Sequence, residues 1–258
     1  MTVHFVGAGP GAADLITLRA ARLLAAADTV LYPGTYLDAE VLSHCRPDAQ
    51  LIDTARLDLD QIVVAMVDAP GEVVRLTSGD PSLYSALHEQ TRRLDAAGVP
   101  WDVTPGVPAY AAAAARVGQE LTVPLVAQSV VLTRTQARST RMPDRERLQD
   151  FAATGATLVL HLAITRIREL MAQVEPHYGA DCPAVVVYRA SQPDETVLHG
   201  TVGGARPIAD AVEDAGLRQA AVILIGPALA ARESGGESYL YSPHRDRSRT
   251  AVDSKDRG

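Results

Sequence analysis

The chain has 258 residues, of which 47% are hydrophobic and 21% are charged, a composition typical of a soluble globular protein. The formal net charge of −7 argues against nucleic acid as a main partner, because phosphate binding needs a basic surface. The apolar runs are far shorter than the roughly 18 residues that a membrane-spanning helix needs, and the first residues lack the features of a signal peptide. Cys45 and Cys182 show no metal or redox spacing, so we expect a reduced, cytoplasmic protein without a metal site.

A buried first strand is expected over residues 3–6, followed by the turn Gly7-Ala8-Gly9-Pro10-Gly11. This spacing departs from the Gly-x-Gly-x-x-Gly of dinucleotide-binding turns, and Pro10 removes a backbone N–H where a pyrophosphate needs one. The turn therefore disfavours a nicotinamide or flavin cofactor. Hydrophobic periodicity predicts that a helix follows over residues 15–24, starting at Ala13 or Asp14.

Strands and helices alternate through the rest of the first half. Strands are expected over residues 29–32, 50–53, 73–77 and 100–104, and helices over residues 37–44, 59–69, 85–97 and 111–115. This alternation predicts a mainly parallel sheet.

The most informative stretch begins where the strand 73–77 runs into Ser78-Gly79-Asp80-Pro81. Gly79 tolerates backbone angles that other residues avoid, and Pro81 can stand in the first turn of a helix that opens at Ser82. In α/β proteins, ligands bind where a strand passes through such a turn into a helix. We therefore expect a ligand site over residues 78–84, while an ordinary turn between a strand and a helix has the same sequence features.

The segment from Gly118 to Pro124 is expected to lead into a second unit. Its strands are predicted over residues 129–133, 157–162, 184–188, 196–201 and 220–225, and its helices over residues 164–174 and 208–215. His161 interrupts an apolar strand, where a lone histidine is more often structural than catalytic. From residue 232 the sequence becomes charged and rich in serine and glycine, which predicts a flexible tail.

An arginine-rich stretch follows the first strand of the second unit. Its low apolar content predicts a solvated loop, but its first arginine stands at a strand end, from which side chains reach ligands. The arginines are Arg134, Arg138, Arg141, Arg145 and Arg147.

Five segments of the chain occur in the same order in one protein family. On these segments the chain resembles the tetrapyrrole (precorrin) methyltransferases that use S-adenosylmethionine, and the resemblance covers residues 3–227. The segments are Val6-Gly7-Ala8-Gly9-Pro10-Gly11 with Asp14-Leu15 and Thr17-Leu18; Ser78-Gly79-Asp80-Pro81 with Tyr84; Pro105-Gly106-Val107 with Ala109 and the alanines 111–114; Thr157-Leu158-Val159-Leu160; and Ala221-Val222-Ile223-Leu224-Ile225-Gly226.

The resemblance implies two α/β domains with mixed sheets, a cofactor cleft between them, and a homodimer. The domains are expected over residues 1–120 and 121–231, with a charged tail over residues 232–258. The residues that the resemblance places against S-adenosylmethionine are Pro10, Ser78, Gly79, Asp80, Leu83, Pro108, Ala109, Leu162, Ala190, Ala220 and Ala221. Three positions depart from the family, because Pro108 stands where many members carry Ser or Thr, Leu162 where many carry Met, and His161 where the residue is often aromatic.

More particular segments, among them residues 79–84, 128–134 and 187–195, resemble the branch of the family that methylates C11 of precorrin-4. Arginine pairs well with the carboxylates of such a substrate, so we expect Arg134 and Arg189 to bind it, with Arg166 as a weaker candidate. Tyr84 and His161 are expected to face the same substrate.

Methyl transfer from a sulfonium mainly requires alignment of the reacting atoms and exclusion of water. The sequence shows no nucleophile–base constellation and assigns no catalytic residue. Other interpretations remain open. The substrate could be the cobalt-containing precorrin-4, another precorrin or uroporphyrinogen. The protein could instead be a non-enzymatic ligand binder or, more distantly, a nucleotide-binding oxidoreductase.

Overall fold

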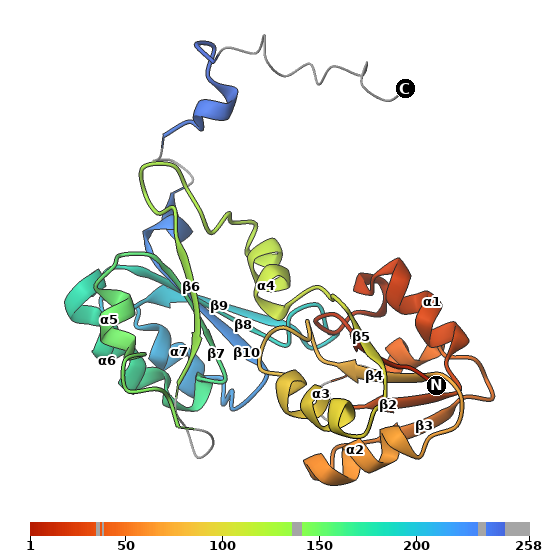
Figure 1. The fold of residues 1–258 in the computed structure, drawn as a ribbon. Helices are drawn as coiled ribbons and strands as arrows, with labels where there is room; N and C mark the ends of the chain where they lie inside the picture. Colours follow the sequence, from red (N-terminus) through yellow and green to blue (C-terminus); the bar gives the residue numbers. More distant parts are fainter. Residues whose placement is uncertain (35–36, 38, 136–140, 232–235, 246–258) are drawn as a thin grey trace.

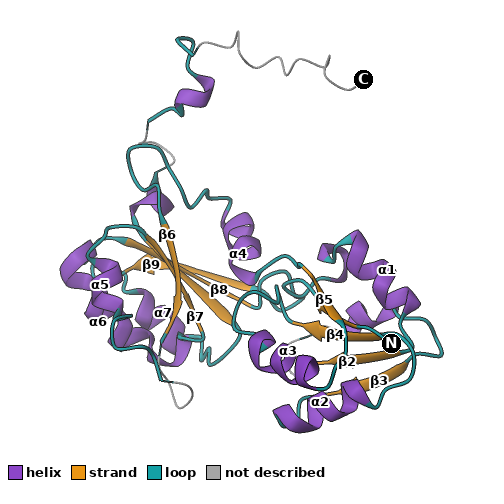
Figure 2. Cartoon of the chain, in the orientation of Figure 1, coloured by secondary structure: helices purple, strands orange, loops and turns teal. Residues whose placement is uncertain are grey.

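The computed structural model describes residues 1–34, 37, 39–135, 141–231 and 236–245. These residues form two five-stranded sheets, one from each half of the chain (Figure 1, Figure 2). The predicted α/β class with two sheets is confirmed. Every helix within these ranges is too short or too polar to span a membrane.

The first sheet has the strand order β3-β2-β4-β1-β5, and all of its neighbouring strands are parallel. The mainly parallel sheet that the alternation of strands and helices predicted is therefore confirmed. The resemblance implied that both sheets mix parallel and antiparallel strands, and such mixing is confined to the second sheet. The strands are β1 (Val3–Gly7), β2 (Thr29–Tyr32), β3 (Gln50–Asp53), β4 (Val73–Thr77) and β5 (Trp101–Thr104).

Helices cover both faces of the first sheet. Successive residues of a strand point to opposite faces, so each face carries its own set of apolar side chains. Phe5 and Leu31 pack under α2 (Leu59–Val67) and α3 (Leu87–Ala96). Their neighbours Val6 and Val30 pack under α1 (Leu18–Ala26), which Figure 1 shows beside the first sheet, and under a 3₁₀ helix, η2 (Ala39–His44), where a helix over residues 37–44 was expected.

Two helix starts differ from the prediction. The predicted start holds only a short 3₁₀ helix, η1 (Ala13–Leu15), and α1 begins at Leu18, because the Thr17 hydroxyl accepts a hydrogen bond from the Ala20 N–H at 3.1 Å and caps it. The helix expected to open at Ser82 begins at Leu87. Tyr84 and Ala86 have φ values of 55° and 56°, which no right-handed helix contains.

The second sheet has the order β6-β7-β10-β8-β9, in which only β6 and β7 run parallel. One face is covered by α5 (Leu148–Ala152), α6 (Ile167–Tyr178) and α7 (Ile208–Asp214). The short α5, which was not predicted, begins directly after the arginine-rich stretch that was predicted as a loop, and Arg138 of that stretch lies outside the described residues. The strands are β6 (Val130–Arg134), β7 (Thr157–His161), β8 (Pro183–Tyr188), β9 (Thr196–Thr201) and β10 (Ala221–Ile225).

The other face of the second sheet is covered by α4 (Ala109–Val117), which the expected domain bounds assign to the first domain. Its Ala112 and Ala113 pack against Val187 and Leu224 of the second sheet, and Figure 1 shows the helix beside that sheet. The division into residues 1–120, 121–231 and 232–258 stays a prediction. We propose that the boundary between the domains lies nearer residue 105, because the chain crosses between the sheets there.

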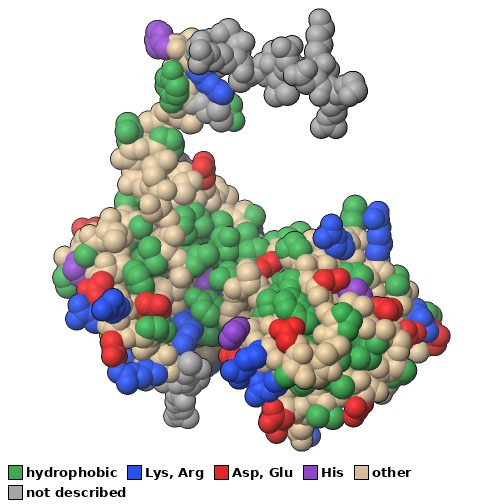
Figure 3. Space-filling view, in the orientation of Figure 1, with side chains coloured by type: hydrophobic (Ala, Val, Ile, Leu, Met, Phe, Trp, Pro, Cys, Tyr) green, Lys and Arg blue, Asp and Glu red, His purple; other side chains and the backbone are tan. Residues whose placement is uncertain are grey.

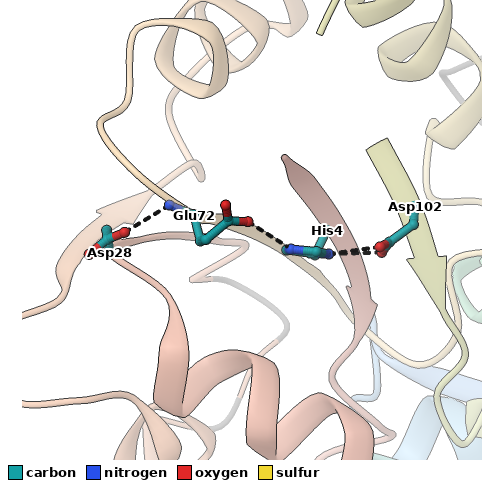
Figure 4. A network of polar contacts seen from close by, with 4 residues as sticks. All are labelled: His4, Asp28, Glu72 and Asp102. Atoms are coloured by element: carbon teal, nitrogen blue, oxygen red, sulfur yellow. Dashed lines mark hydrogen bonds and ion pairs between the residues drawn. The ribbon is translucent and has the colours of Figure 1, made fainter. Parts of the chain in front are cut away.

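Polar contacts join the strands at the amino edge of the first sheet (Figure 4). His4 Nδ1 lies 2.9 Å from Asp102 Oδ1, and His4 Nε2 lies 3.1 Å from Glu72 Oε2. The Glu72 N–H in turn donates to Asp28 Oδ2 at 2.8 Å. These contacts lie at the opposite end of the strands from the turns that follow β1 and β4.

Candidate functional site

A cavity of about 420 Å³ lies where loops from the two sheets meet, a volume within the range of small-molecule sites. The first half contributes residues from the turns after β1 and β4, and the second half contributes residues that follow β7 and β8 or precede β10. Figure 3 shows hydrophobic side chains gathered where the two halves of the molecule meet.

The structure brings the predicted site residues together in the wall of this cavity, except for Arg134 and the weaker candidate Arg166, which is absent from the wall. Arg134 instead lines an adjoining cavity of about 520 Å³, which shares Tyr84 and Leu162 with the first. The predicted residues in the wall of the first cavity are Pro10, Ser78, Gly79, Asp80, Leu83, Tyr84, Pro108, Ala109, His161, Leu162, Arg189, Ala190, Ala220 and Ala221. Their individual roles stay predictions.

Three glycines let the turns at the carboxyl edge of the first sheet pack backbone against backbone. A Cβ atom on Gly106 would lie 2.2 Å from the Gly79 carbonyl oxygen, and one on Gly7 would lie 2.5 Å from the Gly106 Cα. Gly9 and Gly79 also exchange backbone hydrogen bonds of 3.2 and 2.8 Å. The floor of the cavity on this side is therefore main chain with little freedom to move.

Asp80 fastens two of these turns together. Its carboxylate accepts hydrogen bonds from the Gly106 N–H and the Ser82 N–H, each at 2.8 Å, and from the Ser82 hydroxyl. Burial alone would raise the pKa of Asp80, but these hydrogen bonds outweigh burial and hold the pKa below its ordinary value. An ionised acceptor that is already engaged is suited to positioning the wall rather than to removing a proton.

Four cavity residues other than glycine have left-handed backbone conformations. The φ values of Tyr84, Leu162, Arg189 and Ala220 are 55°, 53°, 47° and 50°. Such conformations are costly for residues with a Cβ and tend to cluster at ligand sites. Leu162 and Arg189 directly follow β7 and β8, and Ala220 directly precedes β10, where the Arg189 N–H donates to the Ala220 carbonyl at 2.8 Å.

Two loops close the cavity from opposite halves of the molecule. The Ala12 N–H donates to Ser191 Oγ at 3.0 Å, and the Gln192 side-chain amide donates to the Pro10 carbonyl at 3.4 Å. A Cβ atom on Gly11 would lie 2.3 Å from Gln192 Cγ, so the loops can approach this closely only because Gly11 has no side chain. These contacts tie the turn after β1 to the loop between β8 and β9.

His161 lies at the end of β7 between two tyrosine rings. Its ring centroid is 5.7 Å from that of Tyr84 and 6.4 Å from that of Tyr110. Burial lowers the pKa of the His161 imidazole, which favours the neutral ring near neutral pH. Its Nε2 atom is buried and has no hydrogen-bond partner among the described residues.

The arginines predicted to bind substrate differ in their surroundings. The Arg189 Nε atom lies 2.7 Å from Asp194 Oδ1, whereas Arg166 is bound to Glu169 and to the Thr135 hydroxyl. Arg134 is close enough to Tyr84 to lower the pKa of its phenol, although burial is the larger influence and leaves that pKa raised. Of the three predicted arginines, Arg134 is the one that lines the adjoining cavity beside Tyr84.

Sequence reasoning missed several residues of the cavity wall. Most stand beside residues that it did identify and have ordinary types, so no motif signalled them. Arg218 and Gln219 directly precede the predicted strand start at Ala220, and that position was the only available signal. The residues are Ile164, Thr165, Val187, Gln192, Arg218, Gln219 and Val222.

The wall combines apolar surface with a few polar groups, as sites for amphiphilic ligands do. Leu83, Pro108 and Leu162 provide apolar area, while Asp80 and the Gln192 amide provide polar atoms at the rim. This mixture fits a nucleoside that carries a charged side chain.

Comparison with known proteins assigns the family. The sequence profile of the Tetrapyrrole (Corrin/Porphyrin) Methylases matches residues 2–205. The chain belongs to this family. It is therefore a methyltransferase, and S-adenosylmethionine is its methyl donor.

Individual family members agree with this assignment. A precorrin-4 C(11)-methyltransferase of Rhodococcus erythropolis is 52% identical over 96% of this chain and 99% of its own length. The crystal structure of a cobalt precorrin-4 methyltransferase, a cobalamin biosynthetic enzyme, superposes with a TM-score of 0.84 at 38% identity, covering 88% of this chain and 95% of the other. A uroporphyrin-III C-methyl transferase from Thermus thermophilus, complexed with S-adenosylhomocysteine, gives a TM-score of 0.73 at 27% identity, covering 90% and 100%.

Proposed function

We propose that this chain transfers a methyl group from S-adenosylmethionine to C11 of precorrin-4, giving precorrin-5 in cobalamin biosynthesis. The observation that carries the proposal is the cavity between the sheets, whose wall includes every residue that the resemblance assigned to the methyl donor. The named relative at 52% identity supports C11 of precorrin-4 as the site of methylation.

The methyl donor supplies an electrophilic methyl group on a sulfonium, whose departure leaves a neutral thioether. The chain therefore has to hold the donor and the ring carbon in line and to exclude water. The backbone at Gly79, packed against Gly106, provides a fixed surface, and Leu83 and Leu162 provide apolar cover. Fixed positioning of this kind is worth on the order of 7–11 kcal/mol in well-oriented reactions.

We propose that the adjoining cavity takes part of the tetrapyrrole. It shares Tyr84 and Leu162 with the first cavity, and its wall carries Arg134. Arginine suits the carboxylate arms of a precorrin. Arg189 lies on the other side of the shared wall and would bind an arm by exchanging its contact with Asp194.

The cobalt-containing substrate is the second candidate, because a cobalt precorrin-4 methyltransferase has the same fold at a TM-score of 0.84. Identity is lower for that protein, at 38%, than for the precorrin-4 enzyme, at 52%. We therefore place the metal-free substrate first, and turnover of each substrate by the same preparation separates the two.

We propose that the chain acts as a homodimer in the cytoplasm. Exposed apolar side chains support self-association, since Leu125, Tyr239 and Tyr241 have exposed fractions of 93%, 69% and 76%. Sedimentation equilibrium would show a dimer, and a monomer at all concentrations would contradict the first part. Cys45 and Cys182 are unpaired, as expected in a reducing compartment, and cell fractionation tests the second part.

Calorimetry with S-adenosylhomocysteine and with NAD tests the proposed donor site. We expect heat of binding with S-adenosylhomocysteine and none with NAD. Binding of NAD alone would contradict the proposal. Incubation with precorrin-4 and a methyl-labelled donor should then transfer the label to the tetrapyrrole.

A further inference from the structure

The interior of the first sheet contains a buried cation that the site described above does not include. Arg75, in the middle of β4, has an exposed fraction of 7% and no ion pair with any carboxylate of the described ranges. Burial lowers the pKa of its guanidinium to about 10. A buried charge is costly unless its surroundings satisfy it, so the contacts that Arg75 makes are informative.

The contacts of Arg75 are with neutral side chains. It pairs in register with Phe5 and Leu31, so its side chain points toward the face that α2 and α3 cover. Its Nε atom donates to Gln90 Oε1 and its Nη1 atom donates to Thr54 Oγ1, each at 3.2 Å. The Gln90 side chain is itself buried, with an exposed fraction of 1%.

The Gln90 amide connects this cation to the loop in front of α3. Its Nε2 atom donates to the Ser85 carbonyl at 3.2 Å and to the Ala86 carbonyl at 3.0 Å. These are the last residues of the loop that precedes α3, and the start of α3 has no side-chain cap of its own. The amide therefore takes over the tethering of a segment in which Tyr84 and Ala86 are both left-handed.

An amide can rotate by half a turn and exchange its oxygen for its nitrogen. The rotated amide would direct Oε1 at two carbonyl oxygens and present its NH₂ group to a cation, so both contacts would become repulsive. The guanidinium thus permits a single orientation of Gln90, and that orientation holds the loop.

We propose that Arg75 and Gln90 are positioning residues for methyl transfer: the buried guanidinium orients the Gln90 amide, and the amide holds the loop 81–86, which places Leu83 and Tyr84 in the cavity wall. Neither residue lines the cavity. This inference rests on the proposed function, because Leu83 and Tyr84 matter only if the cavity binds the donor and the substrate.

The replacement Gln90→Glu provides the most direct test, because it keeps the shape and the acceptor for Arg75 but removes both donors to the loop. We expect the dissociation constant of S-adenosylhomocysteine to rise by at least about fivefold, the factor expected from one lost hydrogen bond. Hydrogen exchange should accelerate in residues 81–87 and stay unchanged in β6 to β10. A purely structural role would instead change exchange throughout the first sheet.

Two further variants complete the experiment. Arg75→Met removes the cation and frees the amide to rotate, so it should weaken binding in the same way, and it carries the test if Gln90→Glu does not fold. Thr91→Val is the matched control, because Thr91 is a buried polar neighbour on α3 whose hydroxyl, within the part of the chain that the structure describes, bonds only to the His88 carbonyl. We expect that control to bind as the wild type does.

Three results have distinct meanings. Wild-type affinity in Gln90→Glu, or in Arg75→Met where the first variant is unfolded, would overturn the inference. An equal loss of affinity in Thr91→Val would also overturn it, because any buried polar change on α3 would then suffice. Failure of the wild type to bind S-adenosylhomocysteine would instead contradict the proposed function.

Discussion

Asp80 shows how a single carboxylate can shape the site without taking part in the chemistry. It accepts three hydrogen bonds, and two of them come from backbone N–H groups of different residues, Ser82 and Gly106. Because these bonds favour the ionised form, they lower the pKa of Asp80 and contribute stability above pH 3.8, the ordinary value. That contribution is lost as the pH falls through the lowered pKa.

We expect Asp80→Asn to lower the free energy of unfolding by about 1–2 kcal/mol, the lower part of the range for charged hydrogen bonds because the carboxylate is partly solvated. An amide offers one acceptor atom where the carboxylate offers two, so one of the turns loses its tether. Urea unfolding at neutral pH measures the change. Ser82→Ala, which keeps the backbone donors, serves as the control and should cost less; equal stability of Asp80→Asn and wild type would contradict this role.

His161 gives the protein a second pH dependence, of known sign. Burial lowers the pKa of the folded-state imidazole below 6.5, so the unfolded state binds more protons in the interval between the two pKa values. The contribution of His161 to stability is therefore complete above pH 6.5 and declines as the pH falls through that interval. His161→Phe keeps a ring between Tyr84 and Tyr110 and should flatten the stability profile below pH 6.5; an unchanged slope in urea titrations at several pH values would contradict the prediction.

Site residues could be predicted from the sequence where glycine or proline residues indicated a turn. Gly79 and Pro81 predict a turn at the end of β4, and residues of that turn line the cavity. Nothing in the local sequence marks Leu162 or Ala220 as left-handed, because tertiary contacts impose that conformation on residues that ordinarily avoid it. The pairing of Arg75 with Gln90 was equally invisible, since it joins a strand to a helix fifteen positions later in the chain.

At the scale of elements, the turns after β1, β4 and β5 form one unit. They touch through Gly7, Gly79 and Gly106, and a Cβ atom has no room at Gly7 or Gly106. We expect Gly106→Ala to destabilise the fold by about 2–3 kcal/mol, the upper part of the range for overpacking, and to weaken S-adenosylhomocysteine binding.

The control for Gly106→Ala is Gly98→Ala, at the end of α3. A Cβ atom there would meet nothing within 4 Å, and its only cost is the left-handed φ of +68°. Gly98→Ala should therefore cost about 1 kcal/mol and leave binding unchanged. The predicted packing of the turns would be contradicted if Gly106→Ala were no less stable than the control and bound S-adenosylhomocysteine equally well.

The positions of most strands and helices followed from hydrophobic period and turn residues, but two helix starts did not. Leu15 extended the apolar period of α1 upstream of its true cap, Thr17, so periodicity alone misplaced the start. For α3, Pro81 correctly marks the end of the β4 turn, but the left-handed Tyr84 and Ala86 delay the helix to Leu87.

At the scale of the whole molecule, the cavity exists only because the two sheets meet. Alternation of strands and helices predicted the first sheet and the family resemblance implied the second, yet the alanine-rich α4 gave no sign that it packs on the second sheet. Contacts between the turn after β1 and the β8–β9 loop close the site, chiefly the hydrogen bond of 3.0 Å from Ala12 N–H to Ser191 Oγ.

We expect Ser191→Ala to raise the dissociation constant of S-adenosylhomocysteine by about fivefold, because one hydrogen bond between the halves is lost. Global stability should change little, since each sheet keeps its own core. Calorimetry measures the affinity, and Thr122→Ala, whose exposed hydroxyl bonds to Glu120, is the control. Equal affinities in the two variants would show that this contact does not help to close the site.

The central claim is that the cavity between the sheets directs a methyl group to one carbon of a tetrapyrrole. The most direct measurement is carbon NMR of the product formed from precorrin-4 and a donor with a ¹³C-labelled methyl group. The account predicts a single labelled methyl group, bonded to C11. A label on another ring carbon would contradict the assigned reaction, and an unlabelled tetrapyrrole under conditions in which the protein binds S-adenosylhomocysteine would contradict the assigned substrate.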